Sequence, residues 1–299
     1  MSSVVLSGEF YAFTCASLWA VAIVLFRKSG ETVPPLALNL FKNTIGLVLL
    51  VVTMLAVGTS FAPPDMSVLD WVTLLGSGLV GIAVADTMLF ASLNRLGAGG
   101  SAVVDCLYSP LVILCAVVYL GEPLNPVLIA SMALISGAIV VGTWGPQAAL
   151  PQTSRRARIE GIVLGAASML LMAMGIVAAK PVLERADVWW ATAVRLTGAL
   201  PLLLVLGALP RHRAHVLRAF TPGRHWRVLM PSAVIGAYLA MVLWILGFKL
   251  TSAGVAGLLN QTSTITVLVL ATLFLHEPLT WRKAVAIGMG FGGAVLVVL

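Results

Sequence analysis

Long runs of apolar residues, separated by short polar stretches, make up almost the whole chain. A helix of about 20 apolar residues is long enough to cross the roughly 30 Å hydrocarbon core of a bilayer. Lipid cannot satisfy a free backbone, so a spanning segment of this kind must be helical. The pattern therefore predicts an all-α integral membrane protein with ten transmembrane helices, at residues 9–27, 36–57, 70–92, 98–119, 124–144, 160–180, 188–209, 228–248, 252–275 and 283–299.

The second half of the chain repeats the first. A shift of 155 residues aligns Trp71 with Trp226, Gly81 with Gly236, and Glu122-Pro123-Leu124 with Glu277-Pro278-Leu279. A shift of 153 residues aligns Lys42 with Arg195 and Arg27 with Lys180. Five helices per half is an odd number, so the second half must enter the membrane from the opposite side. The sequence therefore predicts two inverted five-helix repeats, residues 1–145 and 160–299, around a central cavity, joined by a basic cytoplasmic linker at 146–159.

Charged residues are few and unevenly placed. The chain is 60% hydrophobic and 10% charged, with a mean hydropathy of +1.05 and a net charge of +7. Loops after odd-numbered helices hold thirteen basic residues: Arg27, Lys28, Arg95, Arg155, Arg156, Arg158, Arg211, Arg213, Arg218, Arg224, Arg227, Arg282 and Lys283. The other loops hold three: Lys180, Arg185 and Lys249. Because positive loops stay in the cytoplasm, we expect both termini on the outer side, the periplasm of a bacterial cytoplasmic (inner) membrane. Topology then explains the net charge, and no nucleic-acid partner is expected.

We find no sequence motif that indicates an enzyme, a metal site or a cofactor site. Cys15, Cys106 and Cys115 all lie inside predicted helices, so no disulfide framework is implied. The stretch 211–227 holds three histidines, but no cysteine or acidic cluster accompanies them, and we expect a solvated loop. The first apolar segment lacks a preceding basic region, so it is not expected to be a cleaved signal. The last one runs to Leu299 without a polar tail, which suggests that the natural chain extends further.

Two matching turns identify a family resemblance. Residues 120–124 (LGEPL) and 275–279 (LHEPL) each precede a glycine-rich final helix of their half. With the ten spans and the basic residues Lys42 and Arg195, the chain resembles the drug/metabolite transporter superfamily in its EamA-type ten-helix form. It is most similar overall to the YddG-type aromatic amino-acid exporters. The resemblance implies a secondary transporter that exports small metabolites, most of all amino acids including aromatic and neutral ones, by alternating access.

Three other functions stay open. A sugar-phosphate or nucleotide-sugar exchanger shares the architecture, but should show several Lys or Arg around its cavity to balance phosphate. A drug or metabolite exporter of another specificity is a second alternative. A non-transporting membrane scaffold or receptor is the alternative from a different class, and it would lack a water-filled central cavity. The expected partners are a small-molecule substrate and the lipid bilayer, and the chain acts as a monomer or a homodimer.

The signature turns and glycines are expected to be structural. Pro123 and Pro278 suit the first position of the following helix, and Glu122 and Glu277 favour its positive N-terminal end. Ala284, Gly288 and Gly292 recur every four residues, a spacing that lets helices approach closely in lipid. We expect this stripe to pack against the equivalent helix of the first half or against a second protomer.

Polar residues inside predicted helices are the candidates for function. A charge at mid-membrane costs roughly 2.5–3.5 kcal/mol on insertion scales, so Asp86 and Asp105 should face a cavity, a partner or a proton. Asp105, Tyr108 and Ser109 share one helical face, and their repeat mates are polar as well: Asn260, Ser263 and Thr264, with Gln261 beside them. These two stripes either meet at a substrate cavity or bond neighbouring helices to each other.

Two buried cations and three aromatic residues complete the candidate site. Lys42 and Arg195 lie about six residues inside their helices. They either snorkel or pair with Asp86 or Asp105, or they act in gating or hold a substrate carboxylate. Trp19, Tyr238 and Trp244 are candidates to line an apolar cavity. We expect helices 3, 4, 8 and 9 to enclose that cavity and helices 1, 2, 6 and 7 to move around it.

The motion and its coupling are less defined by the sequence. Gly76, Gly78, Gly81, Gly175 and Gly236 are candidate bending points. Small relatives in the superfamily carry a proton on a glutamate inside helix 1, whereas here helix 1 has only Glu9 at its start. Facilitated export is therefore one possibility, and proton coupling through Asp86 or Asp105 is the other.

Overall fold

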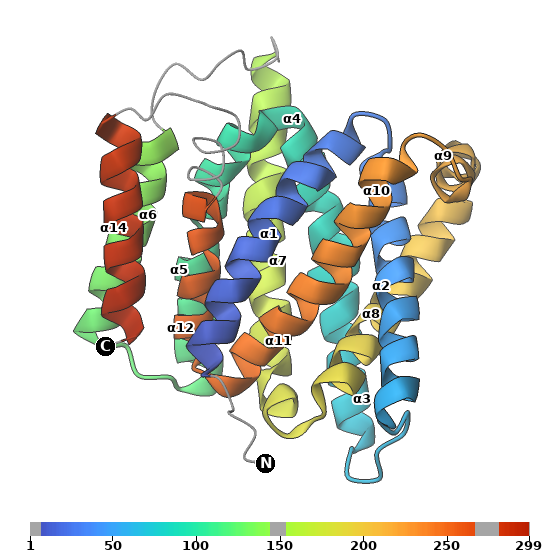
Figure 1. Ribbon diagram of the computed structural model, residues 1–299, viewed down its shortest axis with the longest axis horizontal. Coiled ribbons are helices and arrows are strands. Elements are labelled where there is room, and N and C mark those ends of the chain that lie inside the picture. Colours follow the sequence, from blue (N-terminus) through green and yellow to red (C-terminus); the bar gives the residue numbers. More distant parts are fainter. Residues whose placement is uncertain (1–6, 144–153, 267–280, 299) are drawn as a thin grey trace.

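The computed structural model describes residues 7–143, 154–266 and 281–298, and within these ranges all regular structure is helical (Figure 1). The first half contains α1 (Gly8–Gly30), α2 (Pro35–Val57), α3 (Val68–Gly78), α4 (Ala85–Asp105), α5 (Tyr108–Cys115) and α6 (Pro126–Thr143). Two π-helical segments, η1 (Leu79–Val84) and η2 (Ala116–Leu120), continue α3 into α4 and extend α5.

The second half has the same order of spanning helices, with one additional helix, α9, between its second and third spans. It contains α7 (Arg155–Arg185), α8 (Val188–Ala208), α9 (Pro210–Phe220), α10 (Trp226–Ala233), α11 (Met241–Leu250), α12 (Ala253–Asn260) and α14 (Trp281–Val298). The π-helical segment η3 (Val234–Ala240) joins α10 to α11. It falls on η1 under the 155-residue shift, so both halves interrupt the same helix at the same place.

The helices are those of an integral membrane protein. Six helical runs are long and apolar enough to cross a bilayer, and three shorter apolar helices accompany them within the described residues. These nine fall on nine of the ten predicted spans. The predicted span 252–275 is described only as far as residue 266.

Three predicted boundaries are wrong. A loop was expected between residues 92 and 98, but α4 continues to Asp105 and the break falls at Cys106–Leu107. The stretch has glycines but no proline, and a glycine costs a helix only about 1 kcal/mol. The predicted linker 146–159 already contains the start of α7, where the Ser154 side chain accepts a hydrogen bond from the Ala157 amide. The basic stretch 211–227, expected as a loop, includes most of α9.

Local sequence explains where other helices begin and end. Ser67 and Asp70 form a reciprocal capping box at the start of α3, and the Asp187 carboxylate accepts from two amides at the start of α8. Gly58 ends α2 with φ of 80°, and Gly121 ends η2 with φ of 69°, both in the left-handed region that glycine tolerates.

The two halves pack reciprocally. In the first half α1 contacts α10, η3, α11 and α12 of the second half; in the second half its mate α7 contacts α3, η1, α4 and α5 of the first. α2 packs on α8, and α6 lies beside α14 at one side of the molecule (Figure 1). Each half thus covers the central helices of the other, which is the arrangement that two inverted repeats produce.

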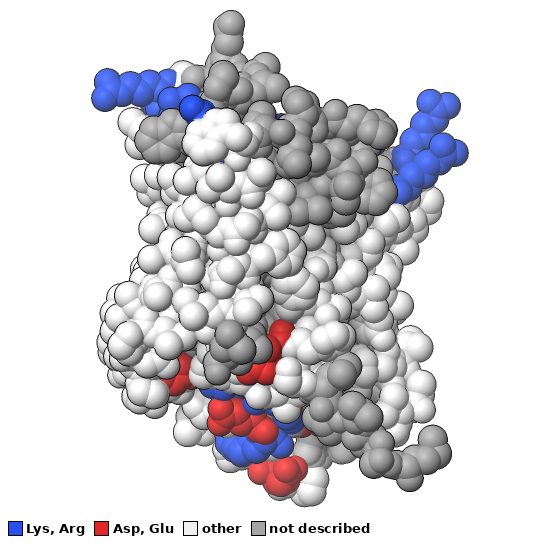
Figure 2. All heavy atoms as spheres, turned by 60° about the vertical axis from the view of Figure 1, so that its left-hand side comes forward, with Lys and Arg blue, Asp and Glu red and all other residues white. Residues whose placement is uncertain are grey.

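Charge separates the two ends of the molecule. Figure 2 shows Lys and Arg projecting from one end and a mixture of acidic and basic side chains at the other. The basic end carries the C-terminus of α1, the N-termini of α7 and α14, and α9 (Figure 1). The opposite end carries the start of α1 and the last turn of α14, together with Asp65, Asp70, Glu184, Arg185 and Asp187.

Candidate functional site

A cavity lies between the two halves, about midway along the spanning helices. It holds about 770 Å³ of space between atoms, open solvent at its mouth included. Met169 and Met172 lie near the middle of α7, and Gly81 and Asp86 lie near the middle of the continuous run α3–η1–α4. The lining consists of Cys15, Trp19, Gly81, Ile82, Asp86, Leu89, Asp105, Tyr108, Met169, Met172, Ala240, Met241, Trp244, Asn260, Gln261, Ser263 and Thr264.

The structure brings most of the predicted site residues together in this cavity. Eight of them line it: Trp19, Asp86, Asp105, Tyr108, Trp244, Asn260, Gln261 and Thr264. The polar stripes of the fourth and ninth predicted helices meet there, as their spacing suggested. They also bond to each other, because the Gln261 side chain accepts from the Ser109 hydroxyl and donates to the Asp105 carbonyl. The two readings of the stripes, a cavity wall and a helix–helix contact, therefore coexist.

The cavity has walls from more helices than the predicted third, fourth, eighth and ninth. α1 and α7, the first and sixth spans, also line the cavity through Cys15, Trp19, Met169 and Met172. Methionines were not singled out from the sequence, because an apolar residue in an apolar helix carries no signal of its own. The repeat did hold a signal, since the 153-residue shift places Trp19 on Met172.

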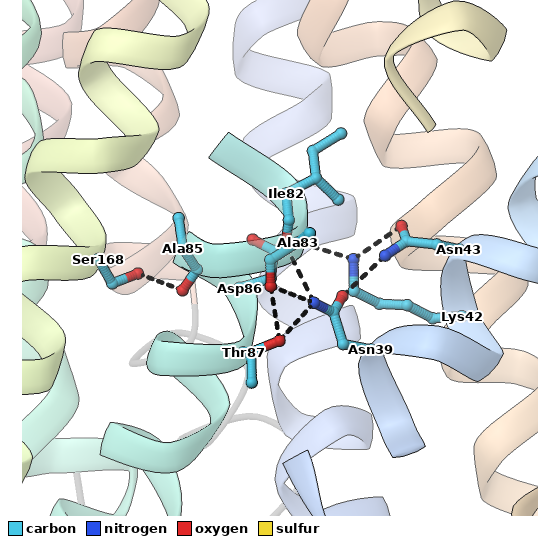
Figure 3. A network of polar contacts seen from close by, with 9 residues as sticks. All are labelled: Asn39, Lys42, Asn43, Ile82, Ala83, Ala85, Asp86, Thr87 and Ser168. Atoms are coloured by element: carbon cyan, nitrogen blue, oxygen red, sulfur yellow. Dashed lines mark hydrogen bonds and ion pairs between the residues drawn. The ribbon is translucent and has the colours of Figure 1, made fainter. Parts of the chain in front are cut away.

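Lys42 lies behind the cavity wall, in a fixed ion pair. Its Nζ is 2.7 Å from Oδ2 of Asp86, and both side chains are almost fully buried, so Lys42 does not snorkel to water. Lys42 Nζ also donates to Asn43 at 3.3 Å, and the Asn43 amide donates to Asn39 at 2.8 Å. Figure 3 shows this chain of contacts running from α2 to the start of α4. The Asp86 carboxylate thus has its counter-charge in Lys42, and the ammonium has a second partner in Asn43.

The π-helical segment η1 supplies acceptors to the same network. The Asn39 amide donates to the carbonyls of Ile82 and Ala83 and to the Thr87 hydroxyl, at 2.9–3.2 Å (Figure 3). A π-helix bonds each amide five residues back instead of four and is common at functional sites. Asn39 therefore ties α2 to the irregular turn that precedes Asp86.

Arg195, the repeat mate of Lys42, has a different environment. Its side chain is 1% exposed, and its Nε, Nη1 and Nη2 have no hydrogen-bond partner among the residues that the structure describes. Its Cζ lies 5.0 Å from the ring centroid of Trp244, a cavity-lining residue, in a cation–π contact. A side-chain Cβ at Gly81, also in the lining, would be 3.7 Å from Nη2. The guanidinium therefore sits at the edge of the cavity, unpaired.

Tyr238 does not line the cavity as predicted. Its hydroxyl shares a 2.7 Å hydrogen bond with Thr53, and its ring stacks on Trp189 with centroids 6.5 Å apart. The side chain thus points from η3 toward α2 and α8.

The turn at Glu122 forms a contact between the two halves. α6 begins at Pro126, so Pro123 does not open the next helix as predicted. The Glu122 carboxylate accepts from the amides of Ala253 at 2.7 Å and Gly254 at 3.1 Å, at the start of α12. The prediction of an acid at a helix N-terminus was right in kind, but the helix belongs to the other repeat. Glu277 and Pro278 lie outside the described residues.

Further contacts lie at the same end, within the second half and, through Thr251, between the halves. Lys180 Nζ donates to the carbonyls of Phe248 at 2.9 Å and Thr251 at 2.8 Å and pairs with Glu184. The Thr251 hydroxyl donates to Glu9 at 2.6 Å. Arg27, the repeat mate of Lys180, makes no hydrogen bond or ion pair with any described residue at the basic end. The described contacts of these two basic residues therefore differ between the two ends of the protein.

The predicted glycine positions have mixed roles. A Cβ at Gly78 would lie 1.8 Å from the Arg195 carbonyl, and the Gly81 Cα would lie 3.1 Å from a Cβ at Gly175. A Cβ at Gly236 would be 2.4 Å from the Phe26 ring, whereas Gly76 has nothing within 4 Å. Four of the five thus allow close helix crossings, and bending at them stays a prediction.

The predicted packing stripe of the last helix faces away from its neighbours. Gly288 and Gly292 have no described atom within 4 Å of an added Cβ. Instead, Gly290 meets Ile265, and Gly293 meets residues 131–135 of α6. The glycines that contact neighbouring helices thus lie on a different face of α14 from the stripe. Pairing of the stripe with a second protomer stays a prediction.

Comparisons with known proteins agree with the architecture. One solved structure, described only as a crystal structure of a protein, superposes with a TM-score of 0.75 at 20% sequence identity, covering 97% of this chain and 94% of that one. At that identity the match shows the fold alone. No curated protein sequence matches the chain significantly. The model of the EamA-like transporter family matches twice, over residues 6–144 and 159–299. The chain is thus a member of the EamA-like transporter family, within the drug/metabolite transporter superfamily.

Proposed function

We propose that the protein exports amino acids, aromatic and neutral ones included, from the bacterial cytoplasm by alternating access. The single observation that carries the proposal is the central cavity, which both repeats line at mid-depth. Inverted-repeat transporters bind substrate at such a place and expose it alternately to the two sides. The basic end faces the cytoplasm in this proposal, with the N-terminus of α1 and the C-terminus of α14 on the periplasmic side.

The chemistry of the lining favours an amphipathic substrate. Trp19, Trp244, Met169, Met172 and Met241 provide apolar, adaptable surface for an aromatic or aliphatic side chain. The polar stripes of α4–α5 and α12 provide carbonyl, hydroxyl and carboxylate groups on the other side of the space. Few precisely placed polar groups in a mainly apolar pocket are typical of small-molecule sites.

The cations argue against a phosphorylated substrate. Of the two buried basic residues near the cavity, Lys42 is already neutralised by Asp86. Among the described residues near the cavity, Arg195 is then the one buried cation without an ion pair, and one guanidinium does not balance the roughly two negative charges of a phosphate group. Sugar-phosphate or nucleotide-sugar exchange is therefore the weaker candidate.

The test is uptake into proteoliposomes that contain the purified protein. The panel consists of labelled threonine, methionine, phenylalanine, tryptophan and one sugar phosphate, each with and without an imposed pH gradient. Saturable amino-acid flux supports the proposal, and its dependence on the gradient decides between proton-coupled and facilitated export. Sugar-phosphate exchange without amino-acid flux would refute the substrate class, and no flux at all would favour a scaffold or receptor.

A further inference from the structure

A second hollow lies at the basic end of the protein, apart from the central cavity. Its walls are the C-terminus of α1, the turn that leads into α2, and α9 with the loop before α10; it holds about 1050 Å³ of space between atoms, open solvent included. α2 packs on both α9 and α10, and Figure 1 shows α9 at the periphery of the bundle. Within the described residues, no helix of the first half corresponds to α9, so the hollow is particular to this end.

Cations without partners line this hollow. Its wall contains Lys28, Arg218 and Arg224 together with two histidines, and Glu31 is the one carboxylate of the lining. Within the part of the chain that the structure describes, none of the three Lys and Arg side chains makes a hydrogen bond or an ion pair. An anion that enters the hollow therefore meets an excess of positive charge that no protein group neutralises.

Helix α2 begins at the hollow without a cap. Its N-cap residue Pro34 lines the hollow and offers no side-chain acceptor. The amides of Leu36 and Ala37, in the first turn, have no hydrogen-bond partner among the described residues. The hydroxyl of Ser29, a buried residue of the same wall, has none among them either. A helix start of this kind carries partial positive charge and favours an anion.

The repeat shows which group caps the equivalent helix in the other half. The 153-residue shift places Pro34 on Asp187. The Asp187 carboxylate accepts hydrogen bonds from the amides of Trp189 at 2.9 Å and Trp190 at 3.0 Å, at the start of α8. The amides of α2 that lack an acceptor are the mates of these two. The first half therefore lacks the anionic oxygen that the second half carries in its own chain, and a bound anion would supply it.

The hollow continues into surface that faces lipid. Val21, Val24 and Lys28 have the spacing of one face of α1, and Val21 and Val24 are 37% and 52% exposed. On α9, Leu217 beside Arg218 is 58% exposed. A lipid whose phosphate lies in the hollow can therefore lay its acyl chains along the apolar face of α1. Basic pockets between spanning helices at the positively charged end of a membrane protein bind anionic headgroups in this way.

We propose that the hollow binds the phosphate headgroup of an anionic phospholipid, with Lys28, Arg218 and Arg224 as its cations. The phosphate oxygens accept from the first turn of α2 and take the place that Asp187 has at α8. The bound lipid thereby joins α1, α2 and α9 at the basic end. The inference concerns the membrane and not the substrate, so it does not depend on what the central cavity carries.

Native mass spectrometry of the purified full chain in detergent tests the proposal. Phosphatidylglycerol, phosphatidylcholine and soluble sn-glycerol 1-phosphate are titrated separately, and the dissociation constant of the first adduct is measured. The native protein is expected to bind phosphatidylglycerol at least about tenfold more tightly than phosphatidylcholine, the effect of a charge-assisted contact. Glycerol phosphate should bind more weakly than phosphatidylglycerol because it has no acyl chains to place on α1.

The variants change charge inside and outside the hollow by the same amount. Arg218→Gln removes a cation of the wall, and Pro34→Asp places a carboxylate where the anion would bind; each should weaken the first phosphatidylglycerol adduct about tenfold or more. Arg211→Gln makes the same charge change on exposed α9 outside the hollow and should leave binding unchanged. Pro34→Ala is the uncharged control for Pro34→Asp and should also bind as the native protein does.

Other outcomes overturn the inference. Equal affinity for the two lipids, or an equal loss in Arg211→Gln and Arg218→Gln, would mean that the attraction is diffuse and that the hollow is no site. Native affinity in Pro34→Asp would mean that the start of α2 does not hold the phosphate. Glycerol phosphate that binds as tightly as phosphatidylglycerol would assign the hollow to a soluble phosphorylated ligand instead of a lipid. Circular dichroism and size-exclusion profiles check that each variant is folded, which we expect of Pro34→Asp because it reproduces the cap of α8.

Discussion

Replacing Lys42 by methionine should destabilise the protein, whereas replacing Arg195 by methionine should not. Lys42→Met leaves the Asp86 carboxylate buried without its cation. At the observed N···O distance of 2.7 Å the Coulomb attraction is about 6 kcal/mol with an effective dielectric constant of 20. The desolvation cost of Asp86 persists in the variant, so the loss should approach the roughly 3–5 kcal/mol found when one partner of a buried pair is removed.

Arg195→Met removes a cation that makes no hydrogen bond or ion pair with any described residue, and Asp86 keeps its short contact with Lys42. The methionine keeps contact with Trp244 and requires no compensating charge, so the free energy of unfolding should stay the same or rise by about 1 kcal/mol. The double variant Lys42→Met with Asp86→Leu replaces a buried pair by apolar groups and should recover most of the stability lost in Lys42→Met.

The assay is reversible unfolding by SDS in mixed micelles, followed by circular dichroism. The native protein, the two single variants and the double variant are compared under one lipid and detergent composition. The reasoning is refuted if Lys42→Met is as stable as the native protein, or if Arg195→Met loses as much stability as Lys42→Met.

Three further predictions concern the packing at Gly78, the Glu122 cap of α12 and the Lys180 contacts with the end of α11. Gly78→Ala places a methyl group against the Arg195 carbonyl and should lower the free energy of unfolding by about 1–3 kcal/mol in the same assay. Gly76→Ala is the control: it has no described atom within 4 Å of the added methyl group, and it should leave that free energy unchanged or raise it by up to about 1 kcal/mol. Glu122→Ala removes the acceptor for two amides of α12 and should cost about 0.5–2 kcal/mol; exposed Glu31→Ala is its control and should have no effect. Lys180→Met removes the bridge to the end of α11 and should raise hydrogen exchange in residues 248–254, and unchanged exchange there would contradict a role for Lys180 in closing this end.

The membrane-spanning architecture was predictable because lipid leaves the backbone few choices. Apolar length, the 155-residue repeat and the uneven loop charge are all properties of the sequence, and they suffice for the family, the helical class and the separation of charge between the ends. The meeting of Asp105 with Gln261 also followed, since two stripes related by an inverted repeat must lie near the axis between the halves.

The partners of individual side chains were not predictable in the same way. Nothing in the spacing of Lys42 and Arg195 indicates that only one of them has an acid, because the missing acid is a substitution at Met241 in another helix. Glu122 was expected to act on its own chain neighbour, but a turn at the end of one repeat faces the helix start of the other. The π-helical segments have no sequence signal of their own, and only their recurrence at matching positions in both halves could have suggested them.

The Lys180 contacts predict which contacts form in the opposite conformation of the transporter. If the two repeats exchange their conformations, as an inverted repeat permits, each contact made by one half is made by its mate. Arg27 takes the place of Lys180, and the carbonyls of Leu93 and Leu96 take the places of those of Phe248 and Thr251. The two sets of contacts, one at each end of the protein, would then never form at the same time. A cross-link between residues 27 and 96 would hold the protein in the conformation that this structure does not show.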